Sequence, residues 1–158
     1  MDKINTMTFD KTMKIDQWDK QTEIFGGHLD PVYRDLDFCE VYYIAGKGFA
    51  VLNFKPRYAL YDRLNIPEIQ DVFVLHDHRG QGIASALIRH CESCVHDGDM
   101  VGISVPVSPE FGAAQRLYYK LGYMPDGNGV SYNREMIMHN SSVKLDDNLC
   151  LMMVKDLK

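Results

Sequence analysis

The sequence contains no long apolar segment. No run of hydrophobic residues approaches the ~20 that a helix needs to cross a bilayer, and Met1–Thr6 lacks the apolar core of a secretory signal peptide. We therefore expect a cytoplasmic protein that makes no contact with a membrane. With 158 residues, 46% of them hydrophobic and 25% charged, the chain has the composition of one ordinary globular domain. We predict a single domain over residues 1–158.

The sequence also lacks an excess of positive charge: acidic side chains outnumber basic ones, and the net charge is −5. This argues against a nucleic-acid partner, which requires a basic surface, and it suits a cationic amine as substrate. The four cysteines are too sparse for a disulfide scaffold. At about 100° per helical residue, the side chains of His90, Cys91, Cys94 and His96 point in directions that do not converge on one ion. We expect no metal site and interpret Cys91 and Cys94 as core residues.

Residues 79–84 read Arg-Gly-Gln-Gly-Ile-Ala and lie between a predicted strand and a predicted helix. The apolar run 72–75 precedes them, and apolar residues follow at helical spacing from Ile83 to Val95. A strand that turns through two glycines into a helix directs several backbone N–H groups and the positive end of the helix dipole to one point, which favours phosphate. Ser85 replaces the last glycine of the dinucleotide fingerprint, and the lysine of a Walker loop is missing.

A second helix, with sequence signals at both of its ends, is predicted over residues 109–121. Ser108 is suited to cap its N-terminus, and Gly122 is suited to end it in a left-handed conformation. Between the two motifs, apolar residues alternate over 101–107 as in a strand. Two glycine-joined apolar runs at 38–45 and 49–54 predict a hairpin, and late strands are expected at 130–139 and 149–154. This order of elements predicts a mixed sheet covered by helices.

The two motifs resemble the signatures of the GNAT superfamily of N-acetyltransferases. The coenzyme A loop of that family reads [Q/R]-x-x-G-x-[G/A], and Arg79, Gly82 and Ala84 match its defined positions. The stretch 114–123, A-x-x-L-Y-x-K-L-G-Y, is similar to the second signature, and the whole resemblance covers residues 66–125. It implies an α/β (α+β) fold with a mixed, mostly antiparallel twisted sheet of six to seven strands, covered by about four helices.

The resemblance also implies an activity. The enzyme would move the acetyl group of acetyl-CoA to a primary amine of a small molecule, by direct attack in a ternary complex and without a metal. The pantetheine arm would pair with the backbone of Phe73 and Val74. Family members often carry an asparagine at the position of Phe111, and because phenylalanine cannot form its hydrogen bond, that contact is either missing here or made by Ser108. The pyrophosphate would lie on Arg79, Gly80, Gln81, Gly82, Ile83 and Ala84.

Two side chains are candidates for proton transfer by the same resemblance. Tyr118 stands where the family places the tyrosine that protonates the departing thiolate, and its neighbour Tyr119 is expected to pack. Glu68 lies where some family members carry a glutamate base. Asp71 is the other carboxylate of this strand, and alternation places it on the opposite face from Glu68 unless a bulge intervenes. A chain of water molecules could also serve as the base.

Several alternatives remain open at this point. The chain could be a non-catalytic coenzyme A-binding or regulatory module of the same fold, or a nucleotide-binding α/β module, although the two nucleotide fingerprints fail. Residues 10–28 predict one or two short helices, and residues 55–66 predict a loop that faces substrate. The acceptor is not encoded in a recognisable motif, and a homodimer is one arrangement that the sequence allows.

Overall fold

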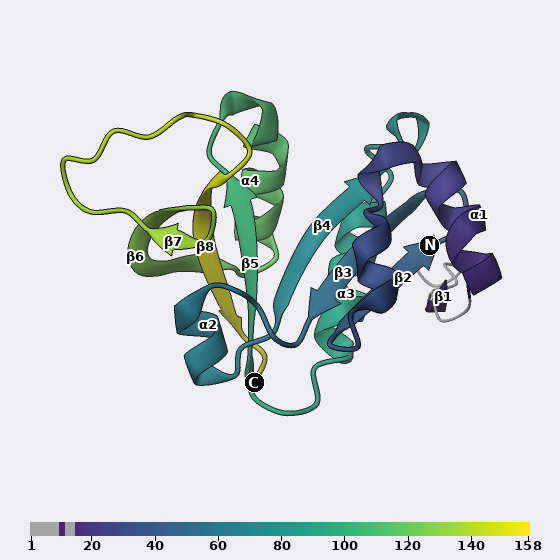
Figure 1. Ribbon diagram of the computed structural model, residues 1–158, viewed down its shortest axis with the longest axis horizontal. Coiled ribbons are helices and arrows are strands. Elements are labelled where there is room, and N and C mark those ends of the chain that lie inside the picture. The colour runs from purple at the N-terminus through teal and green to yellow at the C-terminus, as the bar shows by residue number, and fades with distance from the viewer. Residues whose placement is uncertain (1–9, 12–14) are drawn as a thin grey trace. The chain divides into compact units, whose positions relative to one another are not determined.

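The computed structural model describes residues 10–11 and 15–158, which form two compact units. The first unit contains the described residues up to Phe54 and Ile69–His96, and the second contains Lys55–Glu68 and Asp97–Lys158. Each unit has strands with helices against them, and Figure 1 labels the elements of both. The strand order is β1-β2-β3-β4 in the first unit and β5-β8-β6-β7 in the second.

The first unit is built on an antiparallel hairpin. Its elements are β1 (Asp10–Lys11), α1 (Ile15–Phe25), the 3₁₀ helices η2 (Gly26–His28) and η3 (Pro31–Asp35), β2 (Cys39–Ile44), β3 (Gly48–Asn53), β4 (Glu68–Val74), η4 (His76–His78) and α3 (Ile83–Ser93). The first residue of β4 belongs to the second unit. β2 pairs with β3 from Cys39↔Asn53 to Ile44↔Gly48, which confirms the predicted hairpin.

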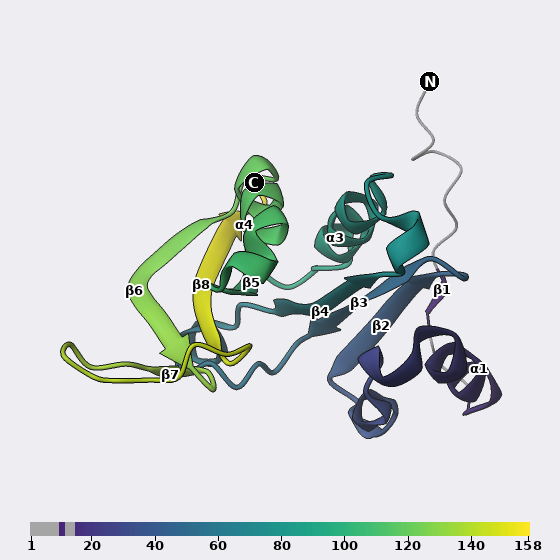
Figure 2. The same cartoon turned by 90° about the horizontal axis from the view of Figure 1, so that it is seen from above.

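Helices cover both faces of this hairpin, as Figure 2 shows. Alternate residues of β2 and β3 point to one face, where they pack with apolar residues of α1 and the segment after it. This core consists of Trp18, Phe25, Leu29, Val41, Tyr43, Phe49 and Val51. On the other face lies α3, which buries its apolar stripe of Ile83, Ala86, Leu87, Ile88 and Cys91. Burial raises the pKa of the Cys91 thiol, consistent with its predicted place in the core.

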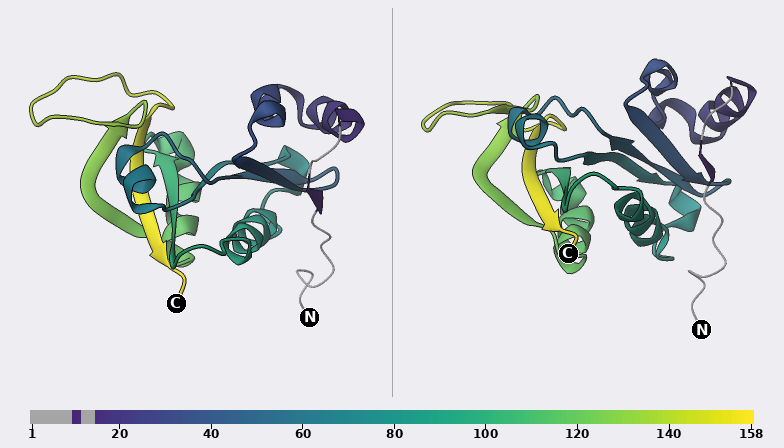
Figure 3. Two further views of the ribbon diagram at one scale, coloured as in Figure 1. Left: turned by 60° about the horizontal axis from the view of Figure 1, so that its bottom comes forward. Right: turned by 90° about the horizontal axis from the view of Figure 1, so that it is seen from below.

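The second unit is an antiparallel sheet whose strand order departs from the order along the chain, and Figure 3 shows this unit with its helices from two further directions. Its elements are α2 (Ala59–Leu64), β5 (Met100–Pro106), η5 (Pro109–Phe111), α4 (Gly112–Lys120), β6 (Met124–Tyr132), β7 (Glu135–Met136) and β8 (Leu149–Asp156). β8 pairs antiparallel with β5 and with β6, and the β6 ladder has an irregularity between Pro125 and Val130. The predicted strand 130–139 has the wrong bounds, since β6 begins earlier and ends at Tyr132. The chain turns at Asn133 and Arg134, which have positive φ, and β7 follows.

The prediction that residues 55–66 form a loop is wrong, and the expectation that they face substrate stays a prediction. The segment contains the helix α2, and the rings of Tyr58 and Tyr61 are buried against Cys150 and Met152 of β8. The Tyr58 hydroxyl donates a hydrogen bond to Asp126 at 2.6 Å, and that of Tyr61 donates to the Met153 carbonyl. The two tyrosines, spaced three residues apart, thus form one buried face. This helical spacing is present in the sequence, but the neighbouring Pro and Arg residues favoured a loop instead.

The predicted fold class is confirmed. The described residues form six strands of six to nine residues, two strands of two residues and four α-helices, and the pairings in both units are mostly antiparallel. None of the described helices is both long enough and apolar enough to span a membrane. The prediction of one domain over residues 1–158 stays a prediction.

Gly48 allows the close approach of two strands in the first unit, and we predict that Gly48→Ala destabilises the fold. A Cβ atom at this position would stand 2.6 Å from the Phe73 carbonyl oxygen, which is backbone and cannot rotate away. The expected loss in the free energy of unfolding is about 1–3 kcal/mol, as for other overpacked sites.

Urea denaturation measures this loss, and Gly27→Ala is the matched control. A Cβ atom at Gly27 meets nothing within 4 Å, and its φ is not positive. The control should therefore keep or raise stability, because alanine reduces the entropy of the unfolded chain. Equal midpoints for both variants would contradict the steric role of Gly48.

Candidate functional site

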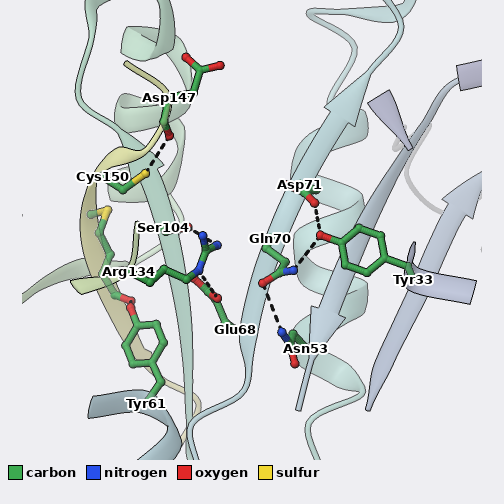
Figure 4. A network of polar contacts seen from close by, with 11 residues as sticks. Tyr33, Asn53, Tyr61, Glu68, Gln70, Asp71, Ser104, Arg134, Asp147 and Cys150 are labelled. Carbon is green, nitrogen blue, oxygen red and sulfur yellow. Dashed lines mark hydrogen bonds and ion pairs between the residues drawn. The ribbon is translucent and has the colours of Figure 1, made fainter. Parts of the chain in front are cut away.

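Strand β4 is continuous, but its regular conformation is interrupted at one residue with left-handed backbone. Asp71 has φ +53, a conformation that is costly for a non-glycine residue. The interruption breaks the alternation of side chains, because the neighbours Gln70 and Asp71 both reach the hydroxyl of Tyr33. The irregularity that could upset the predicted alternation is thus present, and it lies at Asp71 (Figure 4).

The contacts around this hydroxyl form a chain of donors. Asn53 Nδ2 lies 3.5 Å from Gln70 Oε1, Gln70 Nε2 donates to the Tyr33 hydroxyl at 2.8 Å, and that hydroxyl donates to Asp71 Oδ2. Burial and the negative charge of Asp71 raise the pKa of Tyr33, so the phenol keeps its proton. The arrangement therefore presents a fixed, exposed carboxylate at the interruption of β4.

The end of β4 lies among aromatic rings. The ring of Phe73 stacks on His28 with centroids 4.0 Å apart and is tilted on Phe49 at 5.7 Å. The Val74 carbonyl accepts a hydrogen bond from Arg79 Nε at 3.1 Å, which joins the strand to the loop that follows it. Phe73 and Val74, predicted to pair with pantetheine, are half-buried.

The loop 79–84 has the conformation that its two glycines predict. Gly80 has φ +73, and Gly82 has φ +79 and is the N-cap of α3. A Cβ atom at either glycine would meet nothing within 4 Å, so the space beside this backbone is open. The residues from Arg79 to Gly82 are exposed, whereas Ile83 is buried and anchors the helix. The first N–H groups of a helix have no partner within it, and such a helix start fits a pyrophosphate.

Tyr118 lies on the buried side of α4 in the second unit. Its side chain is 7% exposed, and its ring centroid lies 6.3 Å from that of Tyr123. The backbone turns back at the expected place, because Gly122 has φ +98 and Tyr123 N donates to the Tyr118 carbonyl at 3.0 Å. The expectation that Tyr119 packs is wrong, because its side chain is 74% exposed. Consecutive side chains of a helix point about 100° apart, so Tyr119 points away from the buried side that Tyr118 occupies.

The connection into α4 is fixed by a residue that the sequence did not single out. Gln115 Nε2 donates to the carbonyls of Pro106 at 2.8 Å and of Ser108 at 3.3 Å. The Ser108 hydroxyl makes no capping hydrogen bond, so the predicted cap is absent, and the helix begins with the 3₁₀ turn η5. A glutamine inside a helix carries no sequence signal for such a contact.

Glu68 is part of a buried ion pair in the second unit, shown in Figure 4. Its Oε2 accepts a hydrogen bond from Arg134 Nε at 3.2 Å, and Arg134 Nη2 lies 3.4 Å from Ser104 Oγ. The Glu68 side chain is 0% exposed, and that of Arg134 is 23% exposed. The pair holds the first residue of β4 to the turn between β6 and β7, where Asn133 and Arg134 have φ +50 and +62.

Cys94 is half-buried, and its Sγ lies 3.7 Å from His90 Nε2. In the described part of the chain, no group of three or more His, Cys, Asp and Glu side chains is placed to hold a metal ion.

Comparison with known proteins gives one family and many similar folds. The acetyltransferase (GNAT) domain family matches residues 37–125, which is more than half of the chain. No curated protein matches the sequence.

Three solved structures illustrate the likeness of fold. A protein from Desulfovibrio desulfuricans described as a GNAT-family acetyltransferase has a TM-score of 0.64 at 10% identity, covering 96% of this chain and 99% of its own. Arabidopsis thaliana Naa50, bound to the bisubstrate analogue CoA-Ac-MVNAL, has a TM-score of 0.58 at 17% identity, with 94% and 98% covered. A chimera of the Vibrio cholerae spermidine N-acetyltransferase SpeG with hSSAT has a TM-score of 0.52 at 16% identity, with 88% and 76% covered.

The buried ion pair predicts a stability effect. Arg134→Met removes the cation and leaves the buried carboxylate of Glu68 without its ion-pair partner, which should lower the free energy of unfolding by about 3 kcal/mol. The double variant Glu68→Leu/Arg134→Met should recover most of that loss, because two apolar residues replace the pair.

Urea denaturation measures the stability of the two variants, and Arg116→Met is the control for loss of an arginine. Arg116 is exposed on α4, so its loss should change stability little. An Arg134→Met variant as stable as the wild type would contradict the predicted cost of removing the ion-pair partner of Glu68.

Proposed function

The chain belongs to the GNAT acetyltransferase family, and on that premise we propose that it is an N-acetyltransferase. It transfers the acetyl group of acetyl-CoA to a primary amine of a small molecule. The observation that carries the proposal is the loop 79–84, where two left-handed glycines open the N-terminus of α3 to a phosphate group. One acetyltransferase domain over residues 1–158 is part of the same proposal.

Acetyl-CoA would be held mainly by backbone. The N–H groups of Gly80, Gly82 and the first turn of α3 would bind its pyrophosphate, together with those of Arg79, Gln81, Ile83 and Ala84. The pantetheine arm would pair with Phe73 and Val74 as an added strand does. Ser108, whose hydroxyl makes no capping bond, is available for a further contact. No metal takes part in this proposal.

The chemistry requires three proton or charge events. The amine loses a proton and attacks the thioester carbonyl, the oxyanion of the tetrahedral intermediate accepts a hydrogen bond from the Val74 N–H, and the C–S bond breaks as the thiolate takes a proton. Tyr118 would donate that last proton, since a phenol is protonated at neutral pH.

The acceptor is proposed as a small primary amine. The net charge of −5 supports a cationic substrate. The name of the spermidine N-acetyltransferase chimera gives a small amine as the acceptor of that enzyme. The Naa50 complex instead contains the bisubstrate analogue CoA-Ac-MVNAL, which is peptide-like. The fold therefore accommodates both kinds of acceptor, and the charge favours the small amine here.

Glu68 remains the carboxylate that the family resemblance proposes as base. Its burial and its ion pair with Arg134 support a different contribution, which is to hold the start of β4 in place. A base that acts through water is compatible with both. The competing function is a coenzyme A-binding module without turnover, and thiol release from acetyl-CoA in the presence of a library of amines separates the two.

We predict that Gly82→Val abolishes binding of CoA and acetyl-CoA. A β-branched side chain would fill the open space where the pyrophosphate approaches. It would also strain the backbone at φ +79, so the control must carry the same strain.

Gly46→Val is that control. Gly46 lies in the turn between β2 and β3 with φ +69, and its Cβ position is equally open. Isothermal titration with CoA should give wild-type affinity for Gly46→Val and no measurable binding for Gly82→Val, with circular dichroism verifying both folds. Unchanged affinity in a folded Gly82→Val protein would refute the proposed phosphate loop.

We predict that Tyr118→Phe lowers kcat by about 10²- to 10⁴-fold, the range for a positioned general acid, while CoA affinity is retained. Tyr119→Phe is the neighbouring control, and its exposed ring predicts no change. Steady-state acetylation of any accepted amine measures both. Near wild-type kcat for Tyr118→Phe would restrict this residue to packing.

A further inference from the structure

Asp71 occupies an unusual backbone position. Five non-glycine residues in the described part of the chain have positive φ: Asn65, Asp71, Asn133, Arg134 and Asn140. Asp71 is the one among them that lies inside a strand, whereas the others follow a helix or lie in turns and loops. Such strain persists where the surrounding structure enforces it, and it gathers at functional sites.

The strained backbone has one visible consequence for side chains. Gln70 and Asp71 are consecutive and in a regular strand would point to opposite faces, yet both contact the Tyr33 hydroxyl. Because Gln70 donates to that hydroxyl, the hydroxyl proton is directed at Asp71. Asn53, itself buried, lies on the far side of Gln70. The side chains thus fix the orientation of a single carboxylate (Figure 4).

This carboxylate retains capacity for a ligand. A carboxylate has about four acceptor positions, and the Tyr33 hydroxyl uses one of them. The side chain of Asp71 is exposed, and no Lys, Arg or His in the described ranges forms an ion pair with it. Phe73 lies two residues further along the strand. Its ring and the ring of His28 that stacks on it add aromatic surface in the same unit.

We propose that Asp71 binds the ammonium group of the acceptor, with Tyr33 and Gln70 as positioning residues. The inference rests on the proposed function, because Phe73 and Val74, which follow Asp71 directly along β4, are the residues proposed to hold the thioester end of acetyl-CoA. An ammonium group has three donors and a full charge, which matches an oriented and exposed carboxylate. The assignment concerns recognition of the charged amine and not removal of its proton.

Asp71→Asn is the decisive variant. Asparagine accepts left-handed backbone at least as readily as aspartate, so the fold of β4 should persist while the charge is lost. The probes are benzylamine, 1,4-diaminobutane and glycinamide, with benzyl alcohol as a neutral analogue. Calorimetry in the presence of CoA should show the affinity for the amines falling by about 10- to 100-fold, as expected for one charge-assisted hydrogen bond. Binding of benzyl alcohol should not change.

Two further variants complete the design. Asp97→Asn removes an equal charge from an exposed position in the turn after α3 and should bind the amines as the wild type does. Tyr33→Phe keeps the carboxylate and loses its donor. It should raise KM for the amine several-fold, with unchanged KM for acetyl-CoA and unchanged binding of benzyl alcohol, a pattern that general loosening of the fold would not give.

The outcomes separate this inference from the proposed activity. If Asp71→Asn binds and acetylates the amines as well as the wild type, the inference is wrong and the acetyltransferase proposal stands. If the amines bind in an Asp71-dependent way but none is acetylated, the ammonium site stands and the proposed turnover fails. If none of the three amines binds to the wild type or reacts, the ammonium site is refuted together with the proposed amine acceptor.

Discussion

The left-handed backbone of Asp71 interrupts the regular conformation of strand β4, and the shared contact of Gln70 and Asp71 with Tyr33 depends on that interruption. A regular strand would separate the side chains of Gln70 and Asp71 by the thickness of the sheet. The interruption instead lets both meet the hydroxyl of Tyr33. Beyond it, the ring of Phe73 lies against His28 and Phe49, so one residue with an unfavourable φ separates a polar stretch of the strand from an aromatic one.

A similar relation between strain and charge holds in the second unit. The turn residue Arg134 has positive φ, and its guanidinium group is tied to the buried carboxylate of Glu68. A buried ion pair contributes little net stability compared with apolar residues, because both groups lose their hydration. It does penalise any arrangement that leaves one charge alone, and it therefore specifies which turn lies beside the start of β4.

The loop 79–84, which we propose to bind the pyrophosphate, is shaped by its backbone rather than by charged side chains. The two glycines at 80 and 82 supply positive φ at no steric cost, and the space beside them is open. Arg79 turns its Nε back to the Val74 carbonyl, which fixes the entry to the loop. In the function that we propose, anion binding would come from helix N–H groups and the dipole of α3, a source of affinity that persists in a protein of net negative charge.

The sequence by itself determined the features that depend on neighbours along the chain. The glycines of the loop, the stop at Gly122 and the hairpin of β2 and β3 follow from local backbone preference and short-range periodicity, and all were predictable. Contacts between distant residues were not. Tyr33 and Asp71 are 38 residues apart, and Glu68 and Arg134 are 66 apart. The tertiary structure alone decided these pairs, because hydrogen bonds and ion pairs depend on where folding brings two groups together and leave no periodic trace in the sequence.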